Sequence, residues 1–138
     1  MAGYSGTPLA RKLGLVAGTA SFVLNPPAHY ALLLEGAAPP LPLDPAADLP
    51  DGLEFLHLFT RWRAELRARL IEARPILAPD GMVWVSWPKK AAKVATDITE
   101  DVIRAVALPM GLVDVKVCAV DEVWSGLKLV IRKELRGR

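Results

Sequence analysis

The sequence predicts an α/β fold in which helices cover both faces of a mostly parallel sheet. Strand-like apolar runs alternate with helical patterns along most of the chain, which favours parallel strands joined by helices. Residues 53–59 are almost continuously apolar, as in a strand that is buried on both faces. The last two predicted strands, 113–120 and 127–131, are separated only by a hairpin-length loop, so the C-terminal strand is expected to be antiparallel.

Length and composition place limits on the class of protein. The 138 residues amount to about one domain, so residues 1–138 are expected to form a single α/β domain. A net charge of +2, from 17 basic and 15 acidic residues, is too even for a dedicated nucleic-acid or membrane-surface protein. The one cysteine excludes an internal disulfide framework and a cysteine-rich metal site. Neither a membrane-spanning run nor a signal-peptide core is apparent, which predicts a cytoplasmic protein.

The first predicted elements are a short helix and a strand. Thr7 is the expected N-cap of the helix, Pro8 its first residue and Gly14 its C-terminal stop. Residues 19–24 have the pattern of a strand. This strand must end at Asn25-Pro26-Pro27, because a strand does not continue through two prolines.

A short helix and a proline-rich loop are expected next. The helix covers residues 28–35 and ends at Gly36. Residues 37–52 contain five of the twelve prolines and predict a loop, with at most a weak edge strand at 41–43. The buried strand 53–59 follows this loop.

A longer helix is predicted at residues 61–74, with Thr60 as its cap. Its apolar stripe recurs at spacings of four, four and three and consists of Trp62, Leu66, Leu70 and Ala73. A turn at 78–81 is then expected to end the helical region. The strand 82–87, which includes Trp84 as a core residue, follows that turn and stops at Pro88.

The last predicted helix begins at Asp97, which forms a capping-box pattern with Glu100, and ends near residue 108. The two C-terminal strands come after it. The loop at 121–126 joins them and contains Asp121 and Glu122, which fit a turn better than a catalytic carboxylate pair because neighbouring extended residues point to opposite sides.

The carboxyl edge of the sheet is the predicted site, because open parallel sheets bind ligands outside the carboxyl ends of their strands. Lys89 and Lys90 are the main candidates for holding a phosphate or carboxylate, and Arg61 is placed to join them; an ordinary solvated loop is the alternative. Trp87 and Trp124 are candidate aromatic walls or simple packing residues. The full candidate ligand-binding set is Tyr4, Thr7, Asn25, Arg61, Trp87, Lys89, Lys90 and Trp124.

Other reactive side chains have structural explanations. His57 is flanked by leucines and is expected to be buried and hydrogen-bonded, while His29 has no acidic partner nearby in the sequence. Cys118 lies in a predicted strand, which favours an inert buried thiol. No metal-ligand spacing is present, and a triad built on Ser86 would need His57 to point out of the core. The arginines of helix 61–74 and the basic tail are expected to be solvated and salt-bridged.

Residues 12–24 resemble the segment that leads into the cofactor-binding strand of class I methyltransferases, as does the order of the predicted elements. The resemblance implies a shortened Rossmann-like fold and an S-adenosylmethionine site. In those enzymes the first strand ends in an acidic residue and a Gly-x-Gly turn, whereas this chain has Asn25-Pro26-Pro27. Prolines lack an N–H and block close approach. The loop at 37–52 offers only Asp44 or Asp48 for the ribose hydroxyls, so no cofactor is expected.

Four further segments resemble a bacterial family of unknown function. They are Tyr4-Ser5-Gly6-Thr7-Pro8, Ser86-Trp87-Pro88-Lys89-Lys90, residues 96–101 and residues 120–128. The resemblance implies a small cytosolic bacterial protein and carries no catalytic residues with it.

The sequence leaves three hypotheses of function. The preferred one is a non-catalytic binding or regulatory module for a small anionic ligand or a protein partner, with neither nucleic acid nor membrane favoured. The second is a small enzyme that uses S-adenosylmethionine or another nucleotide on the same fold. The third is a self-associating protein, such as a homodimer, in which the last strand, ending at residues 131–133, pairs across an edge.

Overall fold

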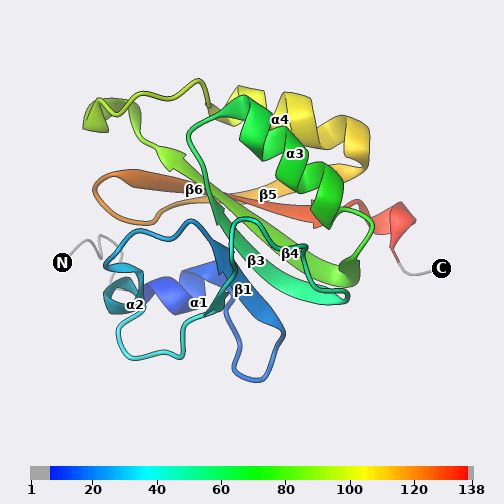
Figure 1. Ribbon diagram of the computed structural model, residues 1–138, viewed down its shortest axis with the longest axis horizontal. Helices are drawn as coiled ribbons and strands as arrows, with labels where there is room; N and C mark the ends of the chain where they lie inside the picture. The colour runs from blue at the N-terminus through cyan, green and yellow to red at the C-terminus, as the bar shows by residue number, and fades with distance from the viewer. Residues whose placement is uncertain (1–6, 137–138) are drawn as a thin grey trace.

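The computed structural model describes residues 7–136, which contain a mixed sheet with the strand order β2-β1-β3-β4-β6-β5 (Figure 1). The strands β1 to β4 pair in parallel, and β6 is antiparallel to both of its neighbours. Their bounds are β1 Ser21–Leu24, β2 Leu41–Pro42, β3 Leu53–Phe59, β4 Leu77–Pro88, β5 Leu112–Ala119 and β6 Trp124–Ile131. The predicted mostly parallel sheet with an antiparallel C-terminal strand is confirmed.

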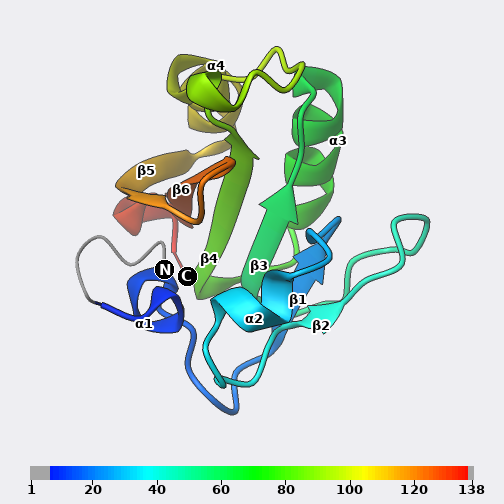
Figure 2. The ribbon, with the colours of Figure 1, turned by 90° about the vertical axis from the view of Figure 1, so that its left-hand side faces the viewer.

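Helices lie on both faces of this sheet, as predicted. Figure 2 shows α3 and α4 on one side and α1 and α2 on the other. Their bounds are α1 Leu9–Leu13, α2 Tyr30–Leu33, α3 Arg63–Ala73 and α4 Glu100–Ala107, with single 3₁₀ turns η1 Lys90–Ala92, η2 Leu108–Met110 and η3 Lys133–Leu135. No helix in the described range 7–136 has the length and apolar character needed to cross a membrane.

Each face of the sheet has its own hydrophobic core. Leu66 and Leu70 of α3 and Ile103 of α4 pack on one face, together with Leu56 and Leu58 of β3. On the other face, Leu9, Leu13 and Tyr30 pack against Phe55, Phe59 and Trp84. Alternate side chains of β3 therefore enter different cores, which explains why this strand is apolar almost throughout.

Several local predictions are confirmed. Gly14 ends α1 in the left-handed conformation, with φ of 73°. The strand β1 ends before Asn25, which also has a positive φ, of 55°. The proline-rich loop contributes only the two-residue edge strand β2. Trp84 is fully buried, and its indole N–H donates to the carbonyl oxygen of Leu13 at 2.7 Å.

The predicted helix caps are wrong in three places. The N-cap of α1 is Pro8 rather than Thr7, and that of α3 is Trp62 rather than Thr60. Thr60 instead donates its hydroxyl to Glu65. The N-cap of α4 is Thr99, whose hydroxyl accepts from the N–H of Val102 at 3.2 Å.

Asp97 does not cap its own helix, α4, as predicted, but contacts the start of another helix, α3. Its carboxylate accepts a hydrogen bond from the backbone N–H of Arg63 at 2.6 Å, at the start of α3. The connection before α4 therefore supplies the capping group for a helix 34 residues earlier. Capping-box spacing cannot reveal such a contact, because it considers only partners within one turn.

Two further predictions in this region are wrong. Residues 78–81 do not form a separate turn, because β4 runs through them and pairs with β3 on both sides of a register shift. Trp62 is 43% exposed rather than buried. As the N-cap residue it has an extended backbone, so its side chain leaves the apolar stripe that begins at Leu66.

The last strand cannot pair across a dimer edge as the third hypothesis requires. β6 lies between β4 and β5 and is hydrogen-bonded on both sides. The outer strand at this end of the sheet is β5, whose pairing is irregular between Asp114 and Lys116. Irregular edges of this kind discourage the addition of another strand.

Candidate functional site

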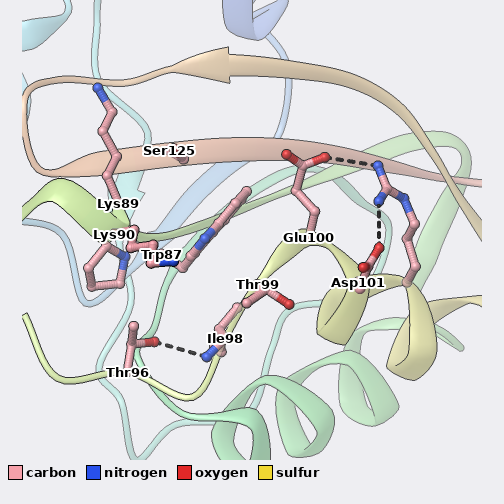
Figure 3. Close-up of a pocket in the computed structure, with 11 residues that line it drawn as sticks. Trp87, Lys89, Lys90, Thr96, Ile98, Thr99, Glu100, Asp101 and Ser125 are labelled. Atoms are coloured by element: carbon pink, nitrogen blue, oxygen red, sulfur yellow. Dashed lines mark hydrogen bonds and ion pairs between the residues drawn. The ribbon is translucent and has the colours of Figure 1, made fainter.

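A pocket of about 700 Å³ lies at the carboxyl end of β4, against the start of α4 (Figure 3). Lys89 and Lys90 lie on one side of it, and Glu100 and Asp101 lie on the other. The eleven lining residues are Trp87, Pro88, Lys89, Lys90, Thr96, Ile98, Thr99, Glu100, Asp101, Arg104 and Ser125. Their segments are β4, the connection to α4, α4 itself and the start of β6.

The carboxylates of this pocket are already paired. Arg104 binds Glu100 at 2.9 Å and Asp101 at 3.1 Å, and it also reaches Asp114 of β5 at 2.9 Å. Hydrogen bonds to Asp114 and Glu100 raise the pKa of Arg104 above its ordinary value. Figure 3 shows Glu100 and Asp101 turned toward this guanidinium. The carboxylates on this side of the pocket are therefore paired, but the side keeps a net negative charge because one arginine serves three carboxylates.

The positive charges of the two lysines, in contrast, are not paired with carboxylates. Within residues 7–136, neither Lys89 nor Lys90 forms an ion pair with a carboxylate. The backbone of Lys89 is held in place, since its N–H donates to the carbonyl oxygen of Val123 at 2.7 Å. Two lysines whose ammonium groups are not paired with carboxylates thus line the pocket.

The base of the pocket is apolar and rigid. Trp87 and Ile98 are 7% and 3% exposed, so both belong to the packed interior. The connection before α4 is tied down by Thr96, whose hydroxyl donates to the carbonyl oxygen of Arg61 at 2.6 Å and accepts from the N–H of Ile98 at 3.1 Å. The arrangement suits a ligand with an anionic group and a less polar body.

The structure brings together three of the eight predicted site residues, Trp87, Lys89 and Lys90. Arg61 is linked to this pocket through its carbonyl oxygen, but its guanidinium lies over the ring of Trp62, 5.3 Å from the centroid. Tyr4 lies outside the described residues.

The other three predicted site residues lie elsewhere. Trp124 packs edge-on against Phe59 in the core beneath α1 and α2, with ring centroids 5.1 Å apart. Asn25 donates its side-chain amide to the carbonyl oxygen of Phe59 at 3.2 Å and to Glu65 at 3.4 Å. Thr7 lines a different cavity, between α1 and β5.

His57 is buried and hydrogen-bonded, as predicted. Its Nδ1 contacts the hydroxyl of Tyr30 at 2.9 Å, and its Nε2 contacts the hydroxyl of Ser86 at 2.7 Å. Burial lowers the pKa of His57 to about 3 and raises the pKa of Tyr30. Both groups are therefore neutral at neutral pH, and Ser86 has no access to a substrate because it is fully buried.

The structure also shows a pair that the sequence patterns do not reveal. His29 at the start of α2 lies 2.8 Å from Asp121 in the loop between β5 and β6. Burial acts to raise the pKa of Asp121, but hydrogen bonds from the N–H of Trp124, from His29 and from the N–H of Val123 together lower it. The two side chains are 92 positions apart in the sequence, so no local pattern indicated their contact. The one available clue was that both segments follow carboxyl ends of strands.

Neither a protein-family model nor a curated protein sequence matches the chain. The resemblance to a bacterial family of unknown function therefore stays a prediction.

Solved structures do match the fold. One is "The structure of LepI complex with SAM", with 13% identity and a TM-score of 0.57 over 96% of this chain. A second is a putative type 11 methyltransferase from Sulfolobus solfataricus, with 15% identity and a TM-score of 0.54 over 85% of this chain and 73% of that one. The present chain spans only 42% of the length of the LepI chain. The likeness shows that this chain has a methyltransferase-like Rossmann fold.

The resemblance noted in the sequence concerns the residues at the carboxyl ends of the first two strands, β1 and β2. The side-chain amide of Asn25 links the ends of β1 and β3 through Phe59. Pro26 and Pro27 have no N–H to offer a ligand. Asp44, which follows β2, accepts the N–H of Ala46 at 2.8 Å within its own turn.

Proposed function

We propose that this protein is a non-catalytic binding module that holds a small anionic metabolite in the pocket between β4 and α4. The observation that carries the proposal is the placement of two lysines without carboxylate partners above an apolar base, in a cavity of about 700 Å³. Small-molecule sites commonly have this size and this combination of an apolar lining with a few fixed polar groups. The ammonium groups of Lys89 and Lys90 hold the phosphate or carboxylate of the ligand.

The absence of catalysis is part of the proposal, because the residues after β1 do not fit S-adenosylmethionine. A Gly-x-Gly turn lets the backbone approach the cofactor, whereas Asn25 fills this position with a side chain bonded to Phe59. The two prolines that follow remove two potential N–H donors. Asp44 would have to leave its turn to reach a ribose.

A small S-adenosylmethionine-dependent enzyme is the second candidate. The fold favours it, since LepI is a structural match and was solved in complex with SAM. Identity of 13% carries no activity from one chain to the other. The two candidates differ in which ligand should stabilise the chain, and a single binding experiment separates them.

The experiment is thermal denaturation with phosphorylated and carboxylated metabolites, nucleotides, S-adenosylmethionine and S-adenosylhomocysteine. A ligand at 100 times its Kd should stabilise the native state by about 2.7 kcal/mol. We expect a phosphorylated or carboxylated compound to raise the Tm, and the double variant Lys89→Ala/Lys90→Ala to lose this response. Stabilisation by the adenosyl compounds alone would instead support the enzyme.

The matched control removes two positive charges outside the pocket. Lys93→Asn combined with Lys133→Ala changes the net charge equally, and asparagine tolerates the positive φ of 57° at position 93. This control should keep the full response to the anion. If the control and the pocket variant lose the response together, the effect comes from net charge and the proposed site is wrong.

A further inference from the structure

A second cavity lies on the opposite face of the sheet from α3 and α4, between α1 and the edge strand β5. Its volume is about 430 Å³. The residues that line it are Thr7, Arg11, Lys12, Lys116, Val117, Cys118 and Ala119. None of them belongs to the pocket between β4 and α4, so a ligand in this second cavity is independent of the proposed function.

The backbone of β5 directs a lysine into this cavity. Residues two apart on a regular strand point to the same face, but the pairing of β5 shifts between Asp114 and Lys116. Asp114 therefore faces α4, where it binds Arg104 at 2.9 Å. Lys116 faces α1, where its ammonium group donates to the carbonyl oxygen of Lys12 at 3.0 Å. Bulges commonly redirect a side chain in this manner next to functional sites.

The charge in the cavity is unbalanced. The ionisable groups among its described lining residues are Arg11, Lys12, Lys116 and the thiol of Cys118. Burial raises the pKa of Cys118, against the smaller opposing effects of Lys116 and Lys12, so the thiol is neutral at neutral pH. Residues 1–6, which precede Thr7 in the sequence, contain no aspartate or glutamate either. Three cations therefore share one cavity without an anionic group among its described lining residues.

Stabilisation of the C-terminal end of α1 does not explain the presence of all three cations. Basic side chains do stabilise the C-terminal end of a helix, and Lys116 donates one hydrogen bond to Lys12 there. An ammonium group has three N–H donors, so two remain for another partner. The guanidinium of Arg11 forms no ion pair within the described residues.

We infer that this cavity is a binding site for a multiply charged phosphate group, either free or as part of a larger molecule. Arg11, Lys12 and Lys116 supply the positive charge, and arginine adds a planar fork of donors that matches phosphate oxygens. The bound anion relieves the mutual repulsion of the three cations. Cys118 lies in the wall of the site and does not react with the ligand.

Cys118 makes the site directly testable, because it is the one cysteine in the chain. Its alkylation by neutral iodoacetamide is followed by mass spectrometry, with inorganic pyrophosphate as the probe and sodium chloride at equal ionic strength as the reference. We expect pyrophosphate to slow alkylation in a saturable manner. Sodium chloride should not slow it to the same degree.

Two variants test the cations. Lys116→Met and Arg11→Met should each raise the pyrophosphate concentration needed for half-protection by about tenfold, the effect of losing one charge-assisted hydrogen bond. Arg11→Met leaves the contact between Lys116 and Lys12 intact, so its effect cannot be ascribed to loosening of α1. The control Lys133→Met removes a charge outside the cavity and should leave protection unchanged.

The outcomes separate binding from a structural function. If pyrophosphate gives no protection, or if it protects Arg11→Met and Lys116→Met as well as it protects the native chain, the proposed site is wrong and the cations only support α1. The variant Lys89→Ala/Lys90→Ala should retain full protection of Cys118. Loss of protection in that variant would overturn the assignment to this cavity and place the anion at the other pocket.

Discussion

Lowering the pH from 7 to 5 should destabilise the protein through His57. This imidazole is fully buried, and burial lowers its pKa from 6.5 to about 3. The unfolded chain therefore binds more protons than the folded chain between these two values. Because of that difference, the stabilisation is complete above pH 6.5 and is lost progressively as the pH falls toward 3.

The magnitude follows from proton linkage. One pKa unit corresponds to about 1.4 kcal/mol, so a histidine that stays neutral when folded and titrates normally when unfolded loses about 2 kcal/mol between pH 7 and pH 5. Solvent does not reduce this figure for His57, since none of its surface is exposed. Its contacts with Tyr30 and Ser86 are to neutral hydroxyls, and no carboxylate among the described residues contacts the ring to compensate an imidazolium.

The assay is urea denaturation at several pH values between 5 and 7. The other histidine, His29, contacts the carboxylate of Asp121, so the comparison is made in a His29→Gln background to remove any contribution from that pair. We expect the free energy of unfolding to fall by about 2 kcal/mol more in this background than in the double variant His29→Gln/His57→Gln. The comparison uses the change with pH, so a constant cost of the second substitution does not affect it. Equal pH dependence of the two variants would refute the reasoning.

Three other substitutions test the packing and capping. Trp84→Phe removes the N–H that serves the buried carbonyl of Leu13, and urea denaturation should show a loss of about 1–3 kcal/mol; an unchanged midpoint would contradict this. Gly126→Ala places a methyl group 3.2 Å from the Trp84 ring, so the same assay should show a loss of about 1–3 kcal/mol in the free energy of unfolding. A loss near zero, as for a surface substitution, would contradict this. Thr99→Ala removes the N-cap of α4, so it should lower the free energy of unfolding by about 1 kcal/mol and speed amide hydrogen exchange at the start of this helix. Unchanged exchange there would show that Thr99 does not act as the cap.

Patterns within one element were sufficient for most of the fold. The continuous apolar run at residues 53–59 identified the central strand, because burial on both faces leaves no polar side to alternate with. The double proline after Asn25 ended the first strand, since proline cannot donate to a ladder. Alternation of strands and helices indicated the parallel sheet, and the short loop before β6 indicated its antiparallel end.

The candidate site was only partly accessible in this way. Lys89 and Lys90 were identified because residues that follow a parallel strand gather at the carboxyl edge, and the pocket does contain them. The same reasoning placed Asn25 and Trp124 in the predicted site, because they also lie at this edge of the sheet. Such a position does not distinguish residues that face a ligand from residues that the interior uses, as the contacts of both with Phe59 show.

The amino-acid sequence alone determined the order and kind of the elements, because backbone conformation and burial periodicity are properties of neighbouring residues. Tertiary structure alone decided which distant side chains meet. Asp97 caps a helix 34 residues away, His29 pairs with Asp121, and a bulge in β5 turns Lys116 toward α1. Contacts of this kind depend on how the strands align and on where each loop crosses the edge of the sheet. Local patterns do not encode that geometry, and both proposed anion sites arise from it.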